Sequence, residues 1–119
     1  MALWQRVSAL ALAQKLGSVR AEQAPWQAFL PGIAIKVLHS EPPFETAIWR
    51  MQPGAKIPSH PHGHDEHCLI LQGSLLVEQV RYFAGDFLMA RTGAIDPVFH
   101  APEGALLLIR AGLRPQKAS

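Results

Sequence analysis

One segment, residues 54–73 (GAKIPSHPHGHDEHCLILQG), constrains this chain more than any other feature. It contains four of the six histidines of the chain, all within eight residues, together with Glu66. A Pro-Gly pair opens the segment and a glycine closes it, so turns bound it at both ends. Imidazole and carboxylate groups together suit divalent Zn, Fe, Mn, Ni or Co. We therefore expect a metal site here, in a fold that brings these side chains together.

Length and composition limit the remaining possibilities. A chain of 119 residues with 49% hydrophobic and 17% charged residues predicts one globular domain. The net charge is +2 and the basic residues are scattered, so we expect no nucleic-acid surface. No apolar run is long enough to span a membrane, and the apolar residues 7–13 are interpreted as helix rather than as a cleaved signal. The single cysteine, Cys68, excludes an internal disulfide, and together these features predict a cytoplasmic protein.

The pattern of elements changes near Pro25. Good helix formers fill residues 2–19, and their apolar positions predict one amphipathic helix that ends near Gly17, within a lead-in of residues 1–24. After Pro25, short apolar segments alternate with Gly and Pro turns, which is typical of an all-β sandwich or barrel. We expect residues 114–119 to be a frayed tail. The expected strands are residues 33–38, 44–51, 57–62, 66–71, 75–80, 87–90 and 105–110.

The spacing of the candidate ligands has a physical meaning. His60 and His62 are two residues apart, so on a strand they point to the same face. A turn then allows Glu66, on the next strand, to face the same cavity. Cys68 follows Glu66 by two residues and is expected to face that cavity as a small buried hydrophobe. His64 lies between Gly and Asp and is interpreted as an exposed loop residue, with a role beside the ligands as the alternative.

The arrangement resembles a known family. The first motif of the cupin superfamily matches residues 54–73 without a gap. Its order here is Gly54, five residues, His60, one residue, His62, three residues, Glu66, six residues and Gly73. The resemblance implies a jelly-roll barrel, also called a double-stranded β-helix, over residues 25–113. Within the superfamily the chain is similar to the ChrR-like cupins, named for the cupin domain of an anti-sigma factor. This narrower likeness depends on Trp26, Pro31-Gly32-Ile33, Lys36-Val37-Leu38, Pro53, Pro58, Leu71, Tyr82 and Gly85-Asp86.

The second cupin motif is where the chain departs from the family. Gly85 and Gly93 occupy the glycine positions, but the position of the expected histidine holds Asp96. A histidine occurs four residues later, in His100-Ala101-Pro102. Without a gap, Asp96 is the fourth ligand; with a small insertion, His100 is. Four residues of strand span about 13 Å, so one strand does not easily supply both. The local His-x-Pro match favours His100, and Asp96 stays open as the alternative.

The resemblance implies a metal-binding cupin that holds one divalent transition ion (Fe, Mn, Zn or Ni) through His60, His62, Glu66 and His100 or Asp96. The favoured function is a small metal-dependent enzyme, a dioxygenase-like oxidoreductase acting on a small organic molecule. The alternative is a ligand- or metal-sensing regulatory module without catalysis; metal-independent binding or isomerisation is a third reading. Residues 1–24 contain neither His nor Cys, so we do not expect the zinc-domain mechanism of the anti-sigma factor. We expect a homodimer that covers the barrel edges and the apolar helix.

Overall fold

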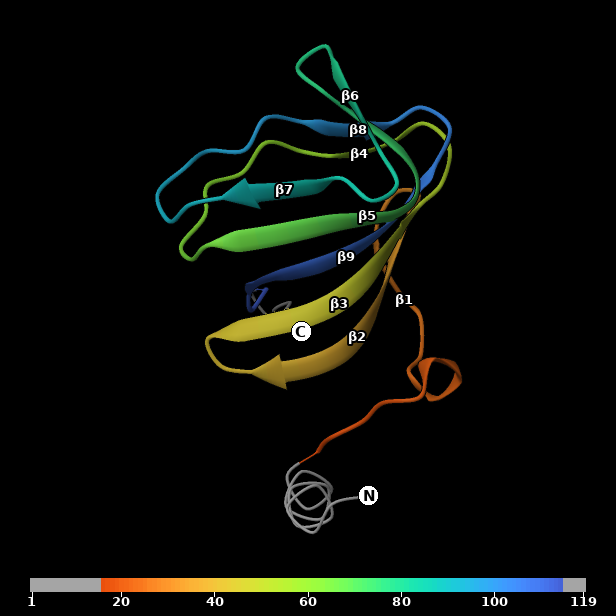
Figure 1. The fold of residues 1–119 in the computed structure, drawn as a ribbon, viewed down its shortest axis with the longest axis vertical. Helices are drawn as coiled ribbons and strands as arrows, with labels where there is room; N and C mark the ends of the chain where they lie inside the picture. The colour runs from red at the N-terminus through yellow and green to blue at the C-terminus, as the bar shows by residue number, and fades with distance from the viewer. Residues whose placement is uncertain (1–15, 115–119) are drawn as a thin grey trace, which may run out of the picture.

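The computed structural model describes residues 16–114, and its regular secondary structure is almost entirely β-strand (Figure 1). A single 3-10 turn, η1 (Ala21–Gln23), precedes the sheet. Among residues 16–114 no helix is long and apolar enough to cross a membrane. The strands are β1 (Gln27–Leu30), β2 (Ile33–Glu41), β3 (Phe44–Met51), β4 (Ala55–Ile57), β5 (Glu66–Val77), β6 (Val80–Phe83), β7 (Phe87–Ala90), β8 (Phe99–Ala101) and β9 (Ala105–Gly112).

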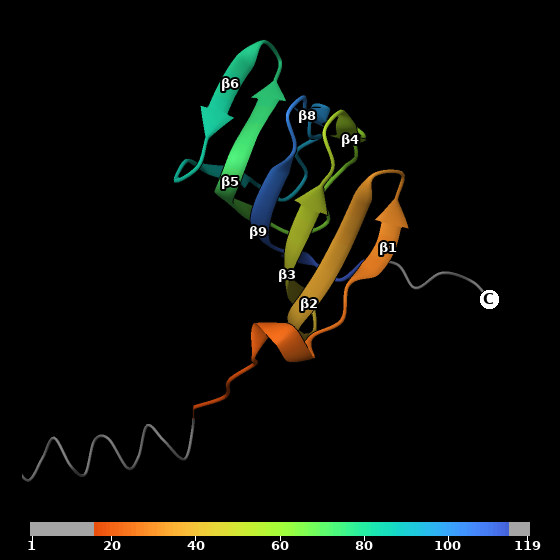
Figure 2. The same ribbon diagram turned by 90° about the vertical axis from the view of Figure 1, so that its right-hand side faces the viewer.

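The longest strand, β5, joins two antiparallel sheets. Its first part pairs with β9 and β7, which continues the order β1-β2-β3-β9-β5 visible in Figure 2. Its last residues pair instead with β6 and β8, and β8 pairs with β4. The change of partner takes place at Gly73, whose φ of +78° is a left-handed conformation that favours glycine. The jelly roll therefore depends on one strand that bends from one sheet into the other.

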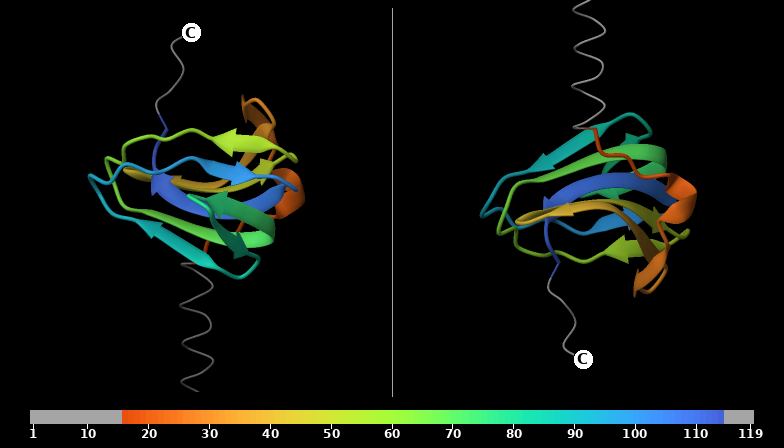
Figure 3. Two further views of the ribbon diagram at one scale, coloured as in Figure 1. Left: turned by 90° about the horizontal axis from the view of Figure 1, so that it is seen from above. Right: turned by 90° about the horizontal axis from the view of Figure 1, so that it is seen from below.

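Side chains from both sheets fill one core. Seen end-on, the strands curl around a common interior (Figure 3). The fully buried side chains alternate along the strands, as period-2 packing requires. Burial of apolar area at roughly 25 cal/mol per Å² is the main stabilising contribution for such a core. The most deeply buried members are Ile35, Cys68, Ile70, Leu75, Leu107 and Ile109.

The all-β fold and the jelly-roll arrangement are confirmed. Strands β3 and β7 have the expected bounds, whereas residues 66–71 and 75–80 are not two separate strands. They form the continuous β5, which is followed by a turn at Glu78 and Gln79 (φ +48° and +72°) and then by β6. The two-residue hairpin was missed because such turns usually contain Asn or Gly.

The expected amphipathic helix falls largely on residues outside the described part of the chain. Residues 16–20, where its last turn was expected, have no regular secondary structure. The expected division into residues 1–24, 25–113 and 114–119 remains a prediction.

Candidate metal centre

Four polar side chains meet inside the barrel. His60 and His62 lie in the extended segment between β4 and β5, Glu66 is the first residue of β5, and Asp96 lies in the loop before β8. One donor atom from each of the four lies within 4.8 Å of the others. All but His60 are buried. Two imidazoles and two carboxylates at these separations are a donor set suited to a divalent transition metal.

Backbone hydrogen bonds between two loops bring Asp96 to the histidines. The amide of His62 donates to the carbonyl of Ala94 at 3.0 Å, and the amide of Asp96 donates to the carbonyl of His60 at 3.0 Å. A second contact holds the same loops together, because Asp65 Oδ1 accepts hydrogen bonds from Thr92 N and Oγ1 at 2.7 and 2.8 Å. These two hydrogen bonds hold the pKa of Asp65 below its usual range. The loop that carries Asp96 is thus fixed to the loop that carries the histidines.

His60 is held with a free nitrogen facing the carboxylates. Its Nδ1 lies 2.8 Å from the carbonyl oxygen of Pro58, which can only accept, so Nδ1 carries the proton and donates. In the neutral ring, Nε2 is then unprotonated and lies 3.8 Å from Glu66 Oε2 and 4.0 Å from Asp96 Oδ2. A lone pair facing two carboxylates at these distances has room for a cation between them. A backbone carbonyl that orients a ligating histidine is common in metal sites.

His62 gives a second indication that a cation fits. Its Nδ1 lies 2.9 Å from Glu66 Oε2 and its Nε2 lies 2.7 Å from Asp96 Oδ2. Despite this short distance, neither Asp96 nor any other group among residues 16–114 is aligned to form a hydrogen bond with the buried Nε2. A buried nitrogen without a hydrogen-bond partner lowers the stability of the folded protein unless an ion or another group binds it. The residues present therefore fit a bound metal ion.

The two carboxylates of the cluster, Glu66 and Asp96, lie close enough to repel each other. Burial raises the pKa of Glu66 above its usual value, and the nearby charge of Asp96 raises it further, while His62 and His60 oppose the shift. Two buried carboxylates this close repel each other unless positive charge lies between them. A divalent ion would supply that charge.

The structure places Asp96, and not the favoured candidate His100, beside the other three side chains. His100 lies on β8 opposite Lys56 and Leu76. Its neighbour Phe99 points into the barrel, so alternation along the strand directs His100 to the other face. The ungapped alternative, Asp96, is the side chain that joins His60, His62 and Glu66.

His64 lies nearby but outside this group. Its ring packs edge-on against Phe44 at 5.5 Å, and Gly112 makes room for it, since a Cβ there would lie 2.7 Å from His64 Cδ2. It is exposed, as expected for a loop residue, and it forms part of the wall of the cavity described next.

A cavity of about 550 Å³ opens beside the four residues. This volume lies within the range of small-molecule sites. Its aromatic wall is an edge-to-face pair, Phe29 and Trp49, with ring centroids 5.3 Å apart. At its rim, Arg114 forms a two-pronged ion pair with Glu45 (2.9 and 3.1 Å), so the two charges cancel. The other apolar wall residues are Leu30, Ile57, Pro58, Pro61, Phe99, Ala111 and Leu113.

Sequence reasoning identified part of this cavity. Its histidine and carboxylate residues were predicted from the motif, whereas the aromatic residues Trp49 and Phe99, which also line it, were not. Phe29 and Arg114 were missed. They come from the first strand and from just after the last one, and no spacing in the sequence indicates that these distant segments meet.

Comparisons with known structures agree on the fold. An acetylacetone dioxygenase from Acinetobacter johnsonii is 19% identical over 82% of this chain and 74% of its own, with a TM-score of 0.72. An RmlC-like cupin from Shewanella frigidimarina is 18% identical over 85% of this chain and 94% of its own, with a TM-score of 0.74. The complex of Rhodobacter sphaeroides SigE with the anti-sigma ChrR matches at 23% identity and a TM-score of 0.67, over 77% of this chain and 50% of that one.

At these identities the structural matches establish the fold and nothing finer. None of the curated proteins compared with the chain matches it. A family model does: residues 14–113, most of the chain, match the ChrR cupin-like domain. The chain belongs to the ChrR cupin-like family.

Proposed function

We propose that this protein is a small metal-dependent enzyme, of the oxygenase type, that acts on a small organic molecule. The observation that carries the proposal is the position of the four-donor cluster on the wall of a largely apolar cavity of about 550 Å³. Donors that converge in this way serve to bind an ion, and a cavity of this size beside them suits a substrate. The similarity to an acetylacetone dioxygenase gives the reaction class support at the level of fold.

His60, His62, Glu66 and Asp96 would hold one divalent ion. Two carboxylates in the set favour Fe or Mn over softer metals, with Zn and Ni as further candidates. When bound, the ion would supply Lewis acidity and, for a redox-active metal, one-electron chemistry. The chain's own residues perform the remaining tasks. Pro58 fixes the tautomer of His60 through its carbonyl oxygen, and the apolar cavity walls keep bulk water away from the reacting groups.

The cavity also limits the substrate. Outside the cluster, the charged side chain that lines the cavity is Arg114, and Glu45 neutralises it, so the rest of the wall offers no unpaired charge to bind a strongly ionic molecule. The aromatic pair Phe29 and Trp49 suits an apolar body. A small molecule with oxygen donors at one end and a hydrocarbon or aromatic part at the other fits these surroundings. Small dicarbonyl compounds, acetylacetone among them, are the first to test.

The test begins with metal content. Purified wild-type protein, loaded in turn with Fe(II), Mn(II), Ni(II) and Zn(II) and desalted, should retain close to one ion per chain. His60→Ala and Asp96→Ala should lose it, whereas His100→Ala is the matched control and should keep it. Oxygen uptake with a panel of dicarbonyl compounds then tests turnover. Wild-type protein that retains no metal would overturn the proposal, and metal loss in His100→Ala with retention in Asp96→Ala would overturn the ligand assignment.

A second candidate function has support of its own. The family model is named for ChrR, and one matched structure is ChrR in complex with a sigma factor. A regulatory module that senses a metal or small ligand would use the same centre without turnover. Thermal stabilisation by a compound of the panel, with no oxygen uptake and no product, would favour this module over the enzyme. Turnover of the same compound would exclude it as the sole function.

The homodimer and the cytoplasmic location stay predictions. Light scattering at micromolar concentration checks the first, and a mass of one chain would contradict it.

A further inference from the structure

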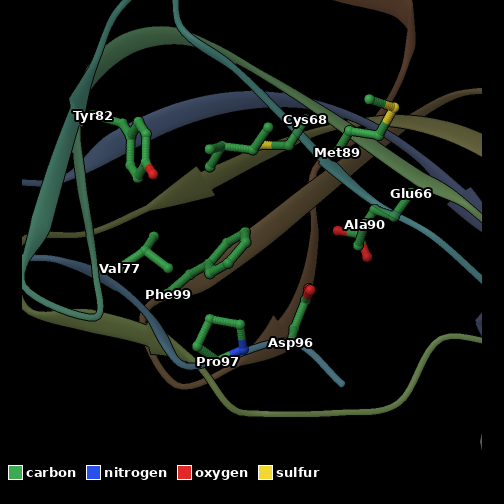
Figure 4. A pocket seen from close by; sticks show the side chains of 10 residues that line it. Glu66, Cys68, Val77, Tyr82, Met89, Ala90, Asp96, Pro97 and Phe99 are labelled. Carbon is green, nitrogen blue, oxygen red and sulfur yellow. The ribbon is translucent and has the colours of Figure 1, made fainter. Parts of the chain in front are cut away.

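A second, smaller cavity lies beside the same cluster. It measures about 160 Å³ and is drawn in Figure 4. Glu66 and Asp96 lie at one end of it, and Val77 and Tyr82 lie at the other. Its remaining wall is mostly apolar and is formed by Leu88, Met89, Ala90, Pro97, Phe99 and the buried Cys68.

The two cavities approach the cluster from different parts of the barrel. Among the described residues, Glu66, Asp96 and Phe99 line both. The larger cavity takes its other walls from β1, β3, β4 and the end of β9, whereas the smaller one takes them from β5, β6 and β7. Phe99 and the two carboxylates thus border both cavities.

Size and polarity define what the smaller cavity can hold. An apolar protein cavity of roughly 150 Å³ can accept benzene or xenon. The two carboxylates at its end disfavour an anion, and the apolar, partly buried side chains of Val77 and Leu88, with the buried Phe99, disfavour a strongly hydrated cation. A small neutral molecule of low polarity is the class that remains. Entry from solvent is available past Met89, which lines the cavity and is 58% exposed.

We propose that the smaller cavity binds a small apolar molecule, dioxygen or one of similar size, next to the metal cluster while the organic substrate occupies the larger cavity. The assignment of dioxygen rests on the proposed function. The affinity for a small apolar molecule does not, because it depends only on the cavity.

The first experiment uses xenon as the probe, on crystals of the protein without added metal. A xenon site is expected among Val77, Leu88 and Phe99. Val77→Phe and Leu88→Phe, two independent variants, should fill the space and abolish it. Leu76→Phe is the matched control, because Leu76 pairs with Arg81 and His100 on the opposite face of β5 and should leave the site intact. Absence of xenon from this cavity in the wild type would overturn the proposal.

The second experiment uses nitric oxide as a diatomic probe of the Fe(II)-loaded protein in a stopped-flow mixer. The association rate should fall several-fold in Val77→Phe and Leu88→Phe at unchanged iron content, and should stay at the wild-type value in Leu76→Phe. Equal rates in all forms would show that the gas arrives by another route and would overturn the proposal. Xenon binding without any metal uptake would contradict the proposed function alone, whereas full metal uptake without a xenon site would contradict this inference alone.

Discussion

The glycine that closes the metal motif should be among the least replaceable residues of the fold. At Gly73 the backbone has φ of +78°, and a Cβ would overlap the carbonyl oxygen of Gly104 and lie 3.0 Å from Cα of Ala105. The left-handed conformation alone costs an alanine about 1–2 kcal/mol. Forcing extra atoms into a packed site adds about 1–3 kcal/mol. Gly73→Ala should therefore lower the free energy of unfolding by about 2–5 kcal/mol, a large share of the roughly 5–15 kcal/mol typical of a domain.

The first glycine of the same motif provides the control. Gly54 has φ of +88°, but nothing in residues 16–114 lies within 4 Å of a Cβ built there. Gly54→Ala should thus lower the free energy of unfolding only by the cost of the left-handed conformation, about 1–2 kcal/mol. Urea unfolding followed by circular dichroism measures the free energy of unfolding of both variants. In thermal unfolding, each kcal/mol lost corresponds to a fall of about 4–8 °C in Tm for a domain near this size. A Gly73→Ala variant no less stable than Gly54→Ala would refute the reasoning, because the clash with Gly104 would then have no cost.

Two further predictions concern the surroundings of the cluster. Asp65→Ala removes both hydrogen bonds to Thr92 and so frees the loop that carries Asp96; metal affinity should fall by about 10-fold or more, as for other groups that orient ligands, in a competition titration with a chelator dye. Cys68 is 2% exposed, and burial raises the pKa of its thiol to about 12. It should therefore react with iodoacetamide at pH 8 only after unfolding in urea, and rapid labelling of the folded protein would contradict the burial.

Much of the fold could be predicted from local signals. Apolar alternation and the Pro-Gly and Gly-containing turns located β2, β3 and β7 well. The pattern missed that β5 continues through Gly73, because a glycine with positive φ reads as a turn whether the strand ends there or bends. It also missed β6, whose turn uses Glu78 and Gln79 in place of the usual turn residues.

The site was predictable where its geometry is local. His60, His62 and Glu66 lie within seven residues, so their closeness along the chain suffices to bring them together, although the expected strand over residues 57–62 ends at Ile57 and the two histidines lie beyond it. Contacts between segments far apart in the sequence decide whether Asp96 or His100 joins the cluster. The choice depends on the register of β8 against β4, which pairs His100 with Lys56, and on hydrogen bonds between two loops. Neither can be read from spacing along the chain.

The identity of the fourth donor determines the charge of the loaded centre. Two neutral histidines, two carboxylates and a divalent ion sum to zero, whereas three histidines and one carboxylate would leave a net charge of +1. One unit of charge at 4 Å is worth about 4 kcal/mol at an effective dielectric constant of 20. Even a fraction of this energy should make anions bind more weakly to the neutral wild-type centre than to a centre with a charge of +1.

Asp96→His converts the donor set into the charged form and tests this argument. With metal content equal in the two proteins, the variant should bind azide at least about tenfold more tightly than the wild type, which corresponds to 1.4 kcal/mol. The affinity is measured from the azide-induced change in the absorption spectrum of the Fe(II)- or Co(II)-loaded protein. Phe99→Leu, which changes the shared wall without changing charge, is the control. Equal azide affinity in wild type and Asp96→His would mean that Asp96 does not contribute its charge to the centre, and the neutral site would have to be abandoned.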